Sequence, residues 1–279
     1  MISCRELAQK IKNEVKAEIK SIIDKDHDNG KPLLYILDNN SSEGQRYIRN
    51  KVRVAEEVGI EAIVLSIKDE MKTANFDDLR DNFITSFPSN AGIIVQLPFT
   101  DNKDKDQELI DKIPIQQDVD GLNENSMVIP ATALGIYEYL KANDLIDGKR
   151  ITIIGRSKLV GMPLAKMLLN TDATVTLCHS KTNDLQSHTL EADVIVCAVG
   201  KINFITRYHL WEDKDYHIID VGINFDEEGA ICGDIADEVH AMDNVTCTPV
   251  PGGVGLLTTA CLMKNTLTLY KTWTDDVIG

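Results

Sequence analysis

The sequence predicts an α/β fold of two domains, a βαβ-type domain and then a doubly wound domain, with a cleft between them. Two series of short apolar runs support this expectation, one in residues 32–98 and one in residues 150–224, because each alternates with helical segments. Near-continuous apolar strands of this kind form parallel sheets that helices cover on both faces. The 279 residues are enough for two modest hydrophobic cores.

The first expected element is an amphipathic helix near the N-terminus. Ser3 and Glu6 have the spacing of a capping box, in which each side chain bonds the backbone N–H of the other residue. Apolar residues then recur at every fourth position and form one buried stripe, namely Leu7, Ile11, Val15 and Ile19.

The first series of apolar runs predicts βαβ units. Its strands are expected at residues 32–38, 61–67 and 91–98. Helices are expected between them at residues 43–59, where Gly59 stops the helix, and at residues 76–87. The charged run at residues 101–108 is interpreted as a solvated loop or the start of a helix.

The second series predicts a doubly wound sheet. Its strands are expected at residues 150–155, 173–178, 192–200 and 216–224. A helix at residues 159–170 and a more polar helix further on alternate with the first three strands. A last helix, over about residues 256–273, follows "PVPGGVG" and could cross back to the first domain.

These elements give the expected domain boundaries. The first domain should contain residues 1–130 plus the C-terminal helix at about residues 257–279, and the second should contain residues 131–256.

The composition argues against several classes of protein. The formal net charge of −15 is unsuited to a sequence-independent grip on nucleic acid, which requires Lys and Arg along the phosphates. The six cysteines include no CxxC pair and no Cys/His cluster, so we expect no metal site, no disulfide framework and a reducing compartment. No window reaches the ~18 apolar residues of a membrane helix. We therefore expect a cytoplasmic protein.

The loop after the strand at residues 150–155 is typical of a phosphate-binding turn. Gly155 and Gly161 lie further apart than the glycines of an ordinary dinucleotide-binding turn, and Arg156 and Ser157 stand between them. The wider loop could bring a guanidinium to the ligand. A tight turn with only a structural role is the alternative.

The segment "CHSKT", residues 178–182, indicates which dinucleotide this loop binds. An NAD-binding protein commonly places Asp or Glu about 20 residues after the glycine turn, where it accepts from the ribose 2′-hydroxyl. Here Ser180 and Lys181 offer a donor and a positive charge instead, which suit a 2′-phosphate. We therefore expect NADP rather than NAD; a solvated polar loop is the alternative.

The first domain contains polar residues at positions that could form one pocket. Tyr47 and Lys51 lie on one face of the helix at residues 43–59, and Gln96 ends an apolar strand at the ligand-binding edge. Asp118 and Asp120 precede a glycine, where one carboxylate could accept two parallel N–H bonds from a ring. Taken alone, each position also fits a structural role.

Together these motifs resemble the bifunctional methylenetetrahydrofolate dehydrogenase/cyclohydrolase family. The resemblance extends from about residue 5 to residue 270 and consists of six motifs in order, which are "YIRNK", "VQLP", "DVDG", "GRSKLVGMP", "CHSKT" and "PVPGGVG". The chain departs from the family pattern in three loops. It has Gly44 at the usual serine, "PATALG" for "PCTPxG", and "GGVGLLT" for "GGVGPMT".

The resemblance implies an activity and a set of site residues. The activity is NADP-dependent oxidation of 5,10-methylenetetrahydrofolate, then hydrolysis of the methenyl product to 10-formyltetrahydrofolate, by a homodimer. The implied catalytic residues are Lys51, Tyr47, Gln96 and Asp120. The implied cofactor-binding residues are Gly155, Arg156, Ser157, Gly161, Ser180, Lys181 and Thr132. The implied substrate-binding residues are Tyr47, Asp120, Pro251, Gly252 and Gly253.

Two other functions are consistent with parts of the sequence. A shikimate-type or amino-acid dehydrogenase would share the two-domain layout, but it would not require the set of Tyr47, Lys51, Gln96 and Asp120. A non-catalytic nucleotide- or folate-binding regulator would tolerate the altered loops. Turnover of a folate substrate distinguishes the first expectation from both alternatives.

Overall fold

The computed structural model describes residues 1–25, 30–39, 44–66 and 87–278. The chain folds into two compact units. The N-terminal unit consists of Gln9–Ala131 and Thr259–Gly279, and the central unit consists of Met1–Ala8 and Thr132–Thr258. The helix predicted at residues 76–87 lies outside the described residues except for Phe87.

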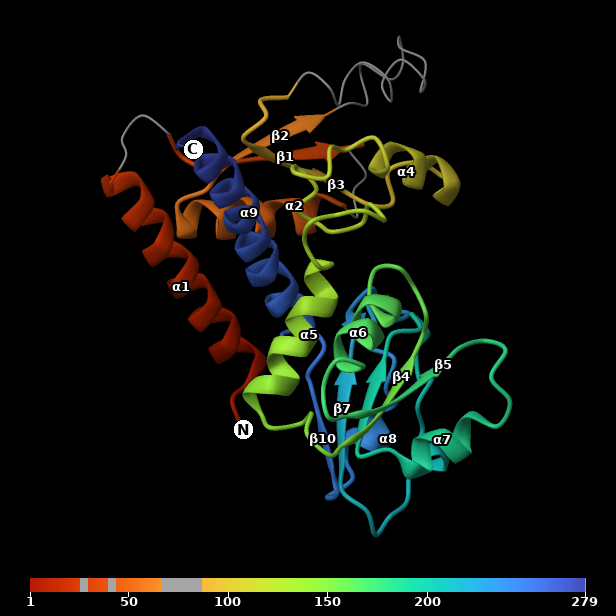
Figure 1. Cartoon of the computed structure of the whole chain (residues 1–279). Helices are drawn as coiled ribbons and strands as arrows, with labels where there is room; N and C mark the ends of the chain where they lie inside the picture. The colour runs from red at the N-terminus through yellow and green to blue at the C-terminus, as the bar shows by residue number, and fades with distance from the viewer. Residues whose placement is uncertain (26–29, 40–43, 67–86, 279) are drawn as a thin grey trace. The chain divides into compact units, whose positions relative to one another are not determined.

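The N-terminal unit contains a parallel sheet of three strands in the order β2-β1-β3 (Figure 1). Their bounds are Leu33–Asp38 for β1, Glu61–Ser66 for β2 and Ala91–Val95 for β3. In the register, Leu33 of the central strand is paired with Glu61 on one side and with Ala91 on the other. Every residue of β3 is buried, as expected for a near-continuous apolar run. The predicted parallel βαβ arrangement is confirmed.

The first helix begins in the central unit, continues into the N-terminal unit and follows the predicted apolar pattern. The helix α1, Cys4–Lys25, begins with the predicted capping box, since Ser3 Oγ accepts from the Glu6 backbone N–H and Glu6 Oε2 accepts from that of Ser3. Its stripe of Leu7, Ile11, Val15 and Ile19 is buried. The other helices described in the N-terminal unit are α2, Gly44–Val58; α4, Lys103–Ile110; and α9, Val254–Ile278, which continues from the central unit.

The central unit contains a parallel sheet of five strands in the order β10-β7-β6-β4-β5. Figure 1 labels β4, β5, β7 and β10 of this sheet. Their bounds are Arg150–Ile154 for β4, Thr174–Cys178 for β5, Val194–Cys197 for β6, Tyr216–Asp220 for β7 and Val245–Cys247 for β10. When the five strands are numbered 1 to 5 along the chain and read across the sheet from β5 to β10, their order is 2-1-3-4-5. This is a doubly wound arrangement. The winding direction reverses between β4 and β6, which is where such sheets bind their ligands. The predicted class of two α/β domains, the second with a doubly wound parallel sheet, is confirmed.

Short helices connect these strands. Both β4 and β5 are contacted by α6, Gly161–Leu168, while α7, Leu185–Glu191, packs on β4 and α8, Asp237–His240, packs on β10. The unit also includes α5, Ala131–Ala142, and a 3₁₀ turn at Arg207–His209. Buried residues such as Ile154, Ile195 and Ile218 form its core.

The predicted strand at residues 216–224 is wrong in its second half. Strand β7 ends at Asp220, whose Oδ1 accepts from the Gly222 backbone N–H at 3.0 Å and turns the chain out of the sheet. Asn224–Phe225 then forms β8, the first strand of a short antiparallel hairpin with β9, Ile231–Cys232. The hairpin, α8 and β10 have no counterpart in the sequence analysis, because elements of two to four residues carry no readable periodicity.

All six cysteines are free thiols, and Cys4, Cys178, Cys197 and Cys261 are buried. Across the described ranges, no helix is both long enough and apolar enough to cross a membrane.

Candidate functional site

The carboxyl edge of the sheet in the N-terminal unit brings Lys51 and Gln96 together. Gln96 follows β3 directly, and its backbone N–H donates to Leu37 O of the adjacent strand at 2.9 Å. Its side-chain Nε2 donates to Leu97 O at 3.0 Å, which fixes the amide plane and presents Oε1 to Lys51. Lys51 Nζ donates to that Oε1 at 2.9 Å. Gln96, only 8% exposed, therefore holds the amine at the end of β3.

The segment after Gln117 brings an acidic turn to the same edge. Ile93 of β3 donates its N–H to Gln117 O at 2.7 Å, and it forms a parallel bridge with Asp118. The first aspartate then holds the turn, because its carboxylate accepts from the N–H groups of Gly121 at 3.0 Å and Asn123 at 2.8 Å. The second aspartate, Asp120, interacts instead with Lys51.

Glycine is required at position 121 of this turn. Its φ is +74°, and an added Cβ would lie 2.6 Å from the Pro130 backbone nitrogen. Gly92 allows the segment to approach β3, since a Cβ there would lie 2.4 Å from Val119 Cγ1. The two glycines therefore determine where Asp120 is placed.

The charges of Lys51 and Asp120 interact in a partly desolvated place. Burial lowers the pKa of Lys51, and the negative charge of Asp120 opposes this shift. Burial likewise raises the pKa of Asp120, and the positive charge of Lys51 opposes it. The neutral amine is consequently more accessible here than for a lysine in water. Such an amine can take up a proton during a reaction.

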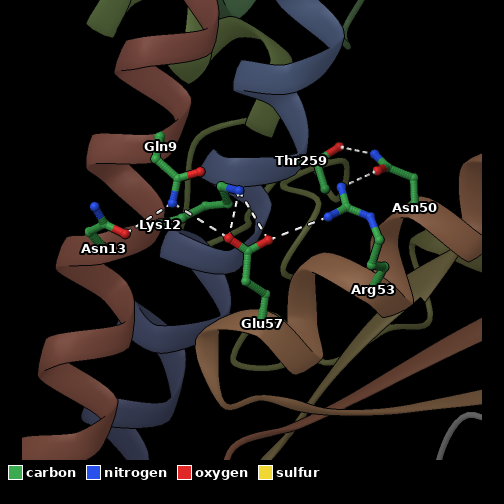
Figure 2. A network of polar contacts seen from close by, with 7 residues as sticks. All are labelled: Gln9, Lys12, Asn13, Asn50, Arg53, Glu57 and Thr259. Atoms are coloured by element: carbon green, nitrogen blue, oxygen red, sulfur yellow. Dashed lines mark hydrogen bonds and ion pairs between the residues drawn. The ribbon is translucent and has the colours of Figure 1, made fainter.

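The helix α2 carries both Tyr47 and Lys51, and a polar network holds a second face of this helix (Figure 2). Glu57 accepts from Lys12 Nζ of α1 at 2.8 Å and pairs with Arg53 at 3.5 Å. Asn50 accepts from Arg53 at 2.9 Å and donates to Thr259 Oγ1 of α9 at 3.2 Å.

This network fixes the direction in which the face of α2 that carries Tyr47 and Lys51 points. Residues 50, 53 and 57 form one stripe of the helix, and residues 47 and 51 form a neighbouring stripe. Contacts from two other helices to the first stripe prevent α2 from rotating about its axis. Tyr47, which is half-buried, is therefore held one turn before Lys51.

The glycine loop of the central unit requires glycine at both predicted positions. Gly155 directly follows β4 and has a φ of +111°, and a Cβ there would lie 2.3 Å from Ala198 O of the loop after β6. At Gly161, the first residue of α6, a Cβ would lie 1.8 Å from Gly155 O. Backbone of this closeness leaves no room for any side chain. The loop thus has the glycine-dependent geometry that a close-lying pyrophosphate requires.

The polar side chains expected to contact the cofactor lie at the same sheet edge. Arg156 and Ser157 are exposed, and Ser157 Oγ accepts from the Val160 backbone N–H at 3.2 Å, which shapes the loop. The adjacent strand β5 leads into a turn in which His179 N donates to Thr182 Oγ1 at 2.8 Å. Ser180 and Lys181 are exposed on that turn. The Gly155 N–H donates to Cys178 O at 2.9 Å, so the two loops lie side by side.

The remaining predicted residues lie in the central unit. Thr132 is in the first turn of α5, where its hydroxyl accepts from Thr258 Oγ1 at 3.3 Å. Pro251, Gly252 and Gly253 form the turn directly before α9; Pro251 is exposed and Gly252 has a φ of +103°. At Gly253 a Cβ would lie 2.3 Å from Pro249 O, so glycine is required there.

Asn265 is a residue of the site that the sequence analysis missed. It is 3% exposed within α9, and its Nδ2 donates to Val119 O at 3.0 Å and to Ile129 O at 2.9 Å. It thereby fixes both ends of the segment that carries Asp120. The only sequence signal was a single amide among the apolar residues of the last helix. Within the ranges that the structure describes, no cluster of His, Cys, Asp or Glu is arranged to hold a metal ion.

Comparisons with known proteins match both units. Residues 2–120 match the catalytic domain, and residues 130–274 the NAD(P)-binding domain, of the tetrahydrofolate dehydrogenase/cyclohydrolase family. The chain is 36% identical over 281 residues to "Bifunctional protein FolD" of Pelagibacter ubique, covering 97% of this chain and 98% of the relative.

Solved structures give the same result. The bifunctional FolD enzyme of Campylobacter jejuni superposes with a TM-score of 0.79 at 32% identity, covering 97% of this chain and 98% of that one. The Trypanosoma brucei dehydrogenase-cyclohydrolase, solved with NADP and an inhibitor, has a TM-score of 0.85 at 28% identity and covers 98% of both chains.

Proposed function

Because this chain belongs to the tetrahydrofolate dehydrogenase/cyclohydrolase family, we propose that it oxidises 5,10-methylenetetrahydrofolate with NADP and hydrolyses the 5,10-methenyl product to 10-formyltetrahydrofolate. The observation that carries the proposal is the Lys51 amine, held 2.9 Å from Gln96 Oε1 and within electrostatic reach of Asp120. We further propose, from the family resemblance, that the enzyme acts in the cytoplasm as a homodimer.

The residues of the central unit fit NADP. The close packing at Gly155 and Gly161 lets a pyrophosphate approach the backbone, and the turn after β5 offers Ser180 and Lys181 rather than a carboxylate. With Arg156 they supply donors and positive charge for a 2′-phosphate. When bound, NADP⁺ supplies the acceptor for the hydride of the methylene carbon. The contribution of the chain to that step is to position the two rings.

The hydrolytic step depends on proton transfer by Lys51. Water attacks the cationic methenyl carbon, and a new C–O bond forms as the neutral amine takes one proton from the water. The resulting ammonium returns this proton to N5 as the C–N5 bond breaks, and the amine, neutral again, takes the remaining hydroxyl proton of the adduct as its C=O bond forms. The formyl group stays on N10, and the one proton released overall passes from Lys51 to solvent. Burial keeps the amine available because it lowers the pKa of Lys51, and Gln96 Oε1 orients the amine.

The other residues bind the folate. We propose that Asp120 accepts from the amino edge of the pterin, and that Tyr47 packs its ring against the folate. Pro251, Gly252 and Gly253 would form a further part of the substrate site, and Thr132 a part of the cofactor site. The direct test is to follow methenyltetrahydrofolate absorbance with purified enzyme and NADP, first during its formation and then during its hydrolysis.

The same assay decides between the alternatives. Reduction of NADP with a hydroxy or amino acid, but not with the folate, would favour the shikimate-type or amino-acid dehydrogenase. Binding of NADPH and folate without turnover would favour the regulator.

We expect Asp120→Asn to weaken folate binding and to shift the pH profile of hydrolysis. The carboxylate raises the pKa of Lys51, so its removal lowers this pKa further. Activity requires the neutral amine, so it rises with pH through the pKa of Lys51. The rising limb of kcat should therefore move to lower pH in the variant, while KM for the folate increases about 10-fold or more.

Asp104→Asn, which changes an exposed carboxylate of the same unit, is the control and should leave both quantities unchanged. If the rising limb of the kcat profile stayed at the same pH or moved to higher pH, the Asp120 carboxylate would not be raising the pKa of Lys51.

We expect Arg156→Ala to weaken NADP far more than NAD. A charged hydrogen bond to a 2′-phosphate contributes about 1.5–3 kcal/mol, so kcat/KM with NADP should fall about 10- to 100-fold, while that with NAD changes little. Lys166→Ala removes an exposed cation from α6 of the same unit and serves as the control. Equal losses with the two cofactors would remove Arg156 from the 2′-phosphate site.

A further inference from the structure

A buried carboxylate, Asp234, organises the loop that follows β6. It is 0% exposed, and its oxygens accept from three successive backbone N–H groups, those of Val199 at 2.8 Å, Gly200 at 3.0 Å and Lys201 at 2.8 Å. The Asn224 side-chain amide donates to it at 3.0 Å. The Cys197 thiol, whose pKa burial raises, stays protonated and donates to it at 3.6 Å.

Successive N–H groups that converge on one point form an anion-binding nest. Here the anion in the nest is a side chain of the same chain, so the loop at residues 199–201 directs its N–H groups inward toward Asp234. The preceding carbonyl, Ala198 O, lies against Gly155, where a Cβ would be only 2.3 Å away. These two loops follow β6 and β4, the neighbouring strands between which the winding reverses.

A second buried carboxylate fixes the first. Asp220, 1% exposed, accepts from the Asp234 backbone N–H at 2.9 Å and from that of Ile235 at 3.3 Å. Glycines make this close arrangement feasible. A Cβ at Gly222 would lie 2.1 Å from Asp234 Oδ1, and a Cβ at Gly233 would lie 1.8 Å from Asp220 Oδ2. The position of Asp234 is therefore determined from both sides, by its own backbone and by the loop that it binds.

We propose that Asp234 is a positioning residue for the dinucleotide. Asp234 holds the loop at residues 198–201 and so keeps Ala198 O against Gly155. The backbone of this loop then borders the cofactor site at the point where the sheet reverses its winding. Asp234 does not contact the ligand in this scheme, because its oxygens are occupied by the loop. The inference rests on the proposed NADP-dependent function.

The position of the carboxylate argues for this role over simple filling of the core. A buried charge contributes less to the stability of a fold than apolar residues of similar size would. Its contribution is instead to select one conformation of the groups that bind it. Here the groups that it specifies are backbone N–H groups of a ligand-facing loop. A merely structural role would affect both activities of the enzyme equally. A positioning role would affect only the one that uses NADP.

The test compares NADPH binding with the hydrolysis that needs no NADP. Asp234→Asn keeps the shape but places an NH₂ against backbone donors, so the Kd for NADPH, measured by fluorescence titration, should rise at least about 10-fold. KM for NADP should rise equally, and kcat for methenyltetrahydrofolate hydrolysis should stay within about 2-fold. Asp226→Asn changes an exposed carboxylate in the turn between β8 and β9 and should alter none of these values.

A milder variant keeps the inference testable if Asp234→Asn does not fold. Asn224→Ala removes one donor to the same carboxylate from a half-buried position, and it should raise the Kd for NADPH about 5-fold. An unchanged Kd in a folded variant would overturn the inference, as would equal losses of both activities. Failure of the proposed function is recognised separately, because then the wild-type chain itself neither binds NADPH nor oxidises the folate, and the inference fails with it.

Discussion

Replacing Lys51 with Met removes hydrolysis of methenyltetrahydrofolate, with kcat falling by about 10²- to 10⁴-fold, the range expected for loss of a general base. Methionine keeps the length and apolar stem of the side chain but cannot accept a proton. Its substitution leaves Gln96 Oε1 without the amine that it holds at 2.9 Å. Hydride transfer requires no strong base, so NADP-dependent oxidation should persist within about 10-fold. Methenyl absorbance, corrected for spontaneous hydrolysis, measures both steps.

A matched variant on the same helix provides the control for this result. Arg49→Met removes a cation of similar length from an exposed position of α2, and it should leave both activities unchanged. Retained hydrolysis in a folded Lys51→Met enzyme would show that another group takes the proton. Parallel loss of the two activities would instead indicate damage to substrate binding.

Substitution of Gly161 by Ala is expected to have the second largest effect. The new Cβ would lie 1.8 Å from Gly155 O, and both elements are backbone, so no side chain can move to relieve the contact. Overpacking of this kind costs about 1–3 kcal/mol of stability. The loop must also open, which should weaken NADPH binding by about 100-fold or more. Hydrolysis of methenyltetrahydrofolate should continue below the Tm of the variant, since Lys51, Gln96 and Asp120 lie in the N-terminal unit.

Gly148→Ala separates loss of the cofactor loop from a general loss of stability. Gly148 has a φ of +71° in the central unit, but nothing lies within 4 Å of an added Cβ. Alanine there costs about 1–2 kcal/mol through its left-handed backbone and should leave the Kd for NADPH unchanged. If both alanine variants weakened NADPH equally, the close approach of Gly161 to Gly155 would not explain the effect. Thermal unfolding and NADPH titration on the same samples decide this.

Local patterns in the sequence predicted most of the described fold. The runs that form β1, β3, β4 and β6 are apolar because both faces of a parallel strand are buried. Such a run is recognisable in the sequence even when the partner strands are unknown. The capping box at Ser3 and Glu6 likewise depends on residues three apart. The strand predicted to run to residue 224 ends at Asp220, because the Asp220 carboxylate accepts from the Gly222 N–H and turns the chain out of the sheet.

The functional roles of similar residues could not be distinguished by local patterns. In "DVDG", the two aspartates are equivalent by spacing, yet Asp118 binds the N–H groups of its own turn and Asp120 interacts with Lys51. Asp234 gave no signal at all, because the amides it binds lie more than 30 residues earlier in the chain. Asn265 is similar, since its partners Val119 and Ile129 are over 130 residues away.

The sequence by itself determined the family, the strands and helices with readable periodicity, and the types of chemical group available for a folate and a dinucleotide. Tertiary structure decided which of those groups meet: Lys51 with Gln96 across 45 residues, and Gly155 with Ala198 O between β4 and β6. The physical reason is that periodicity and capping arise from neighbours along the chain, where backbone geometry fixes the distances. Contacts at the edge of a sheet depend instead on strand order and on close backbone approach, which are set only once the whole unit has folded.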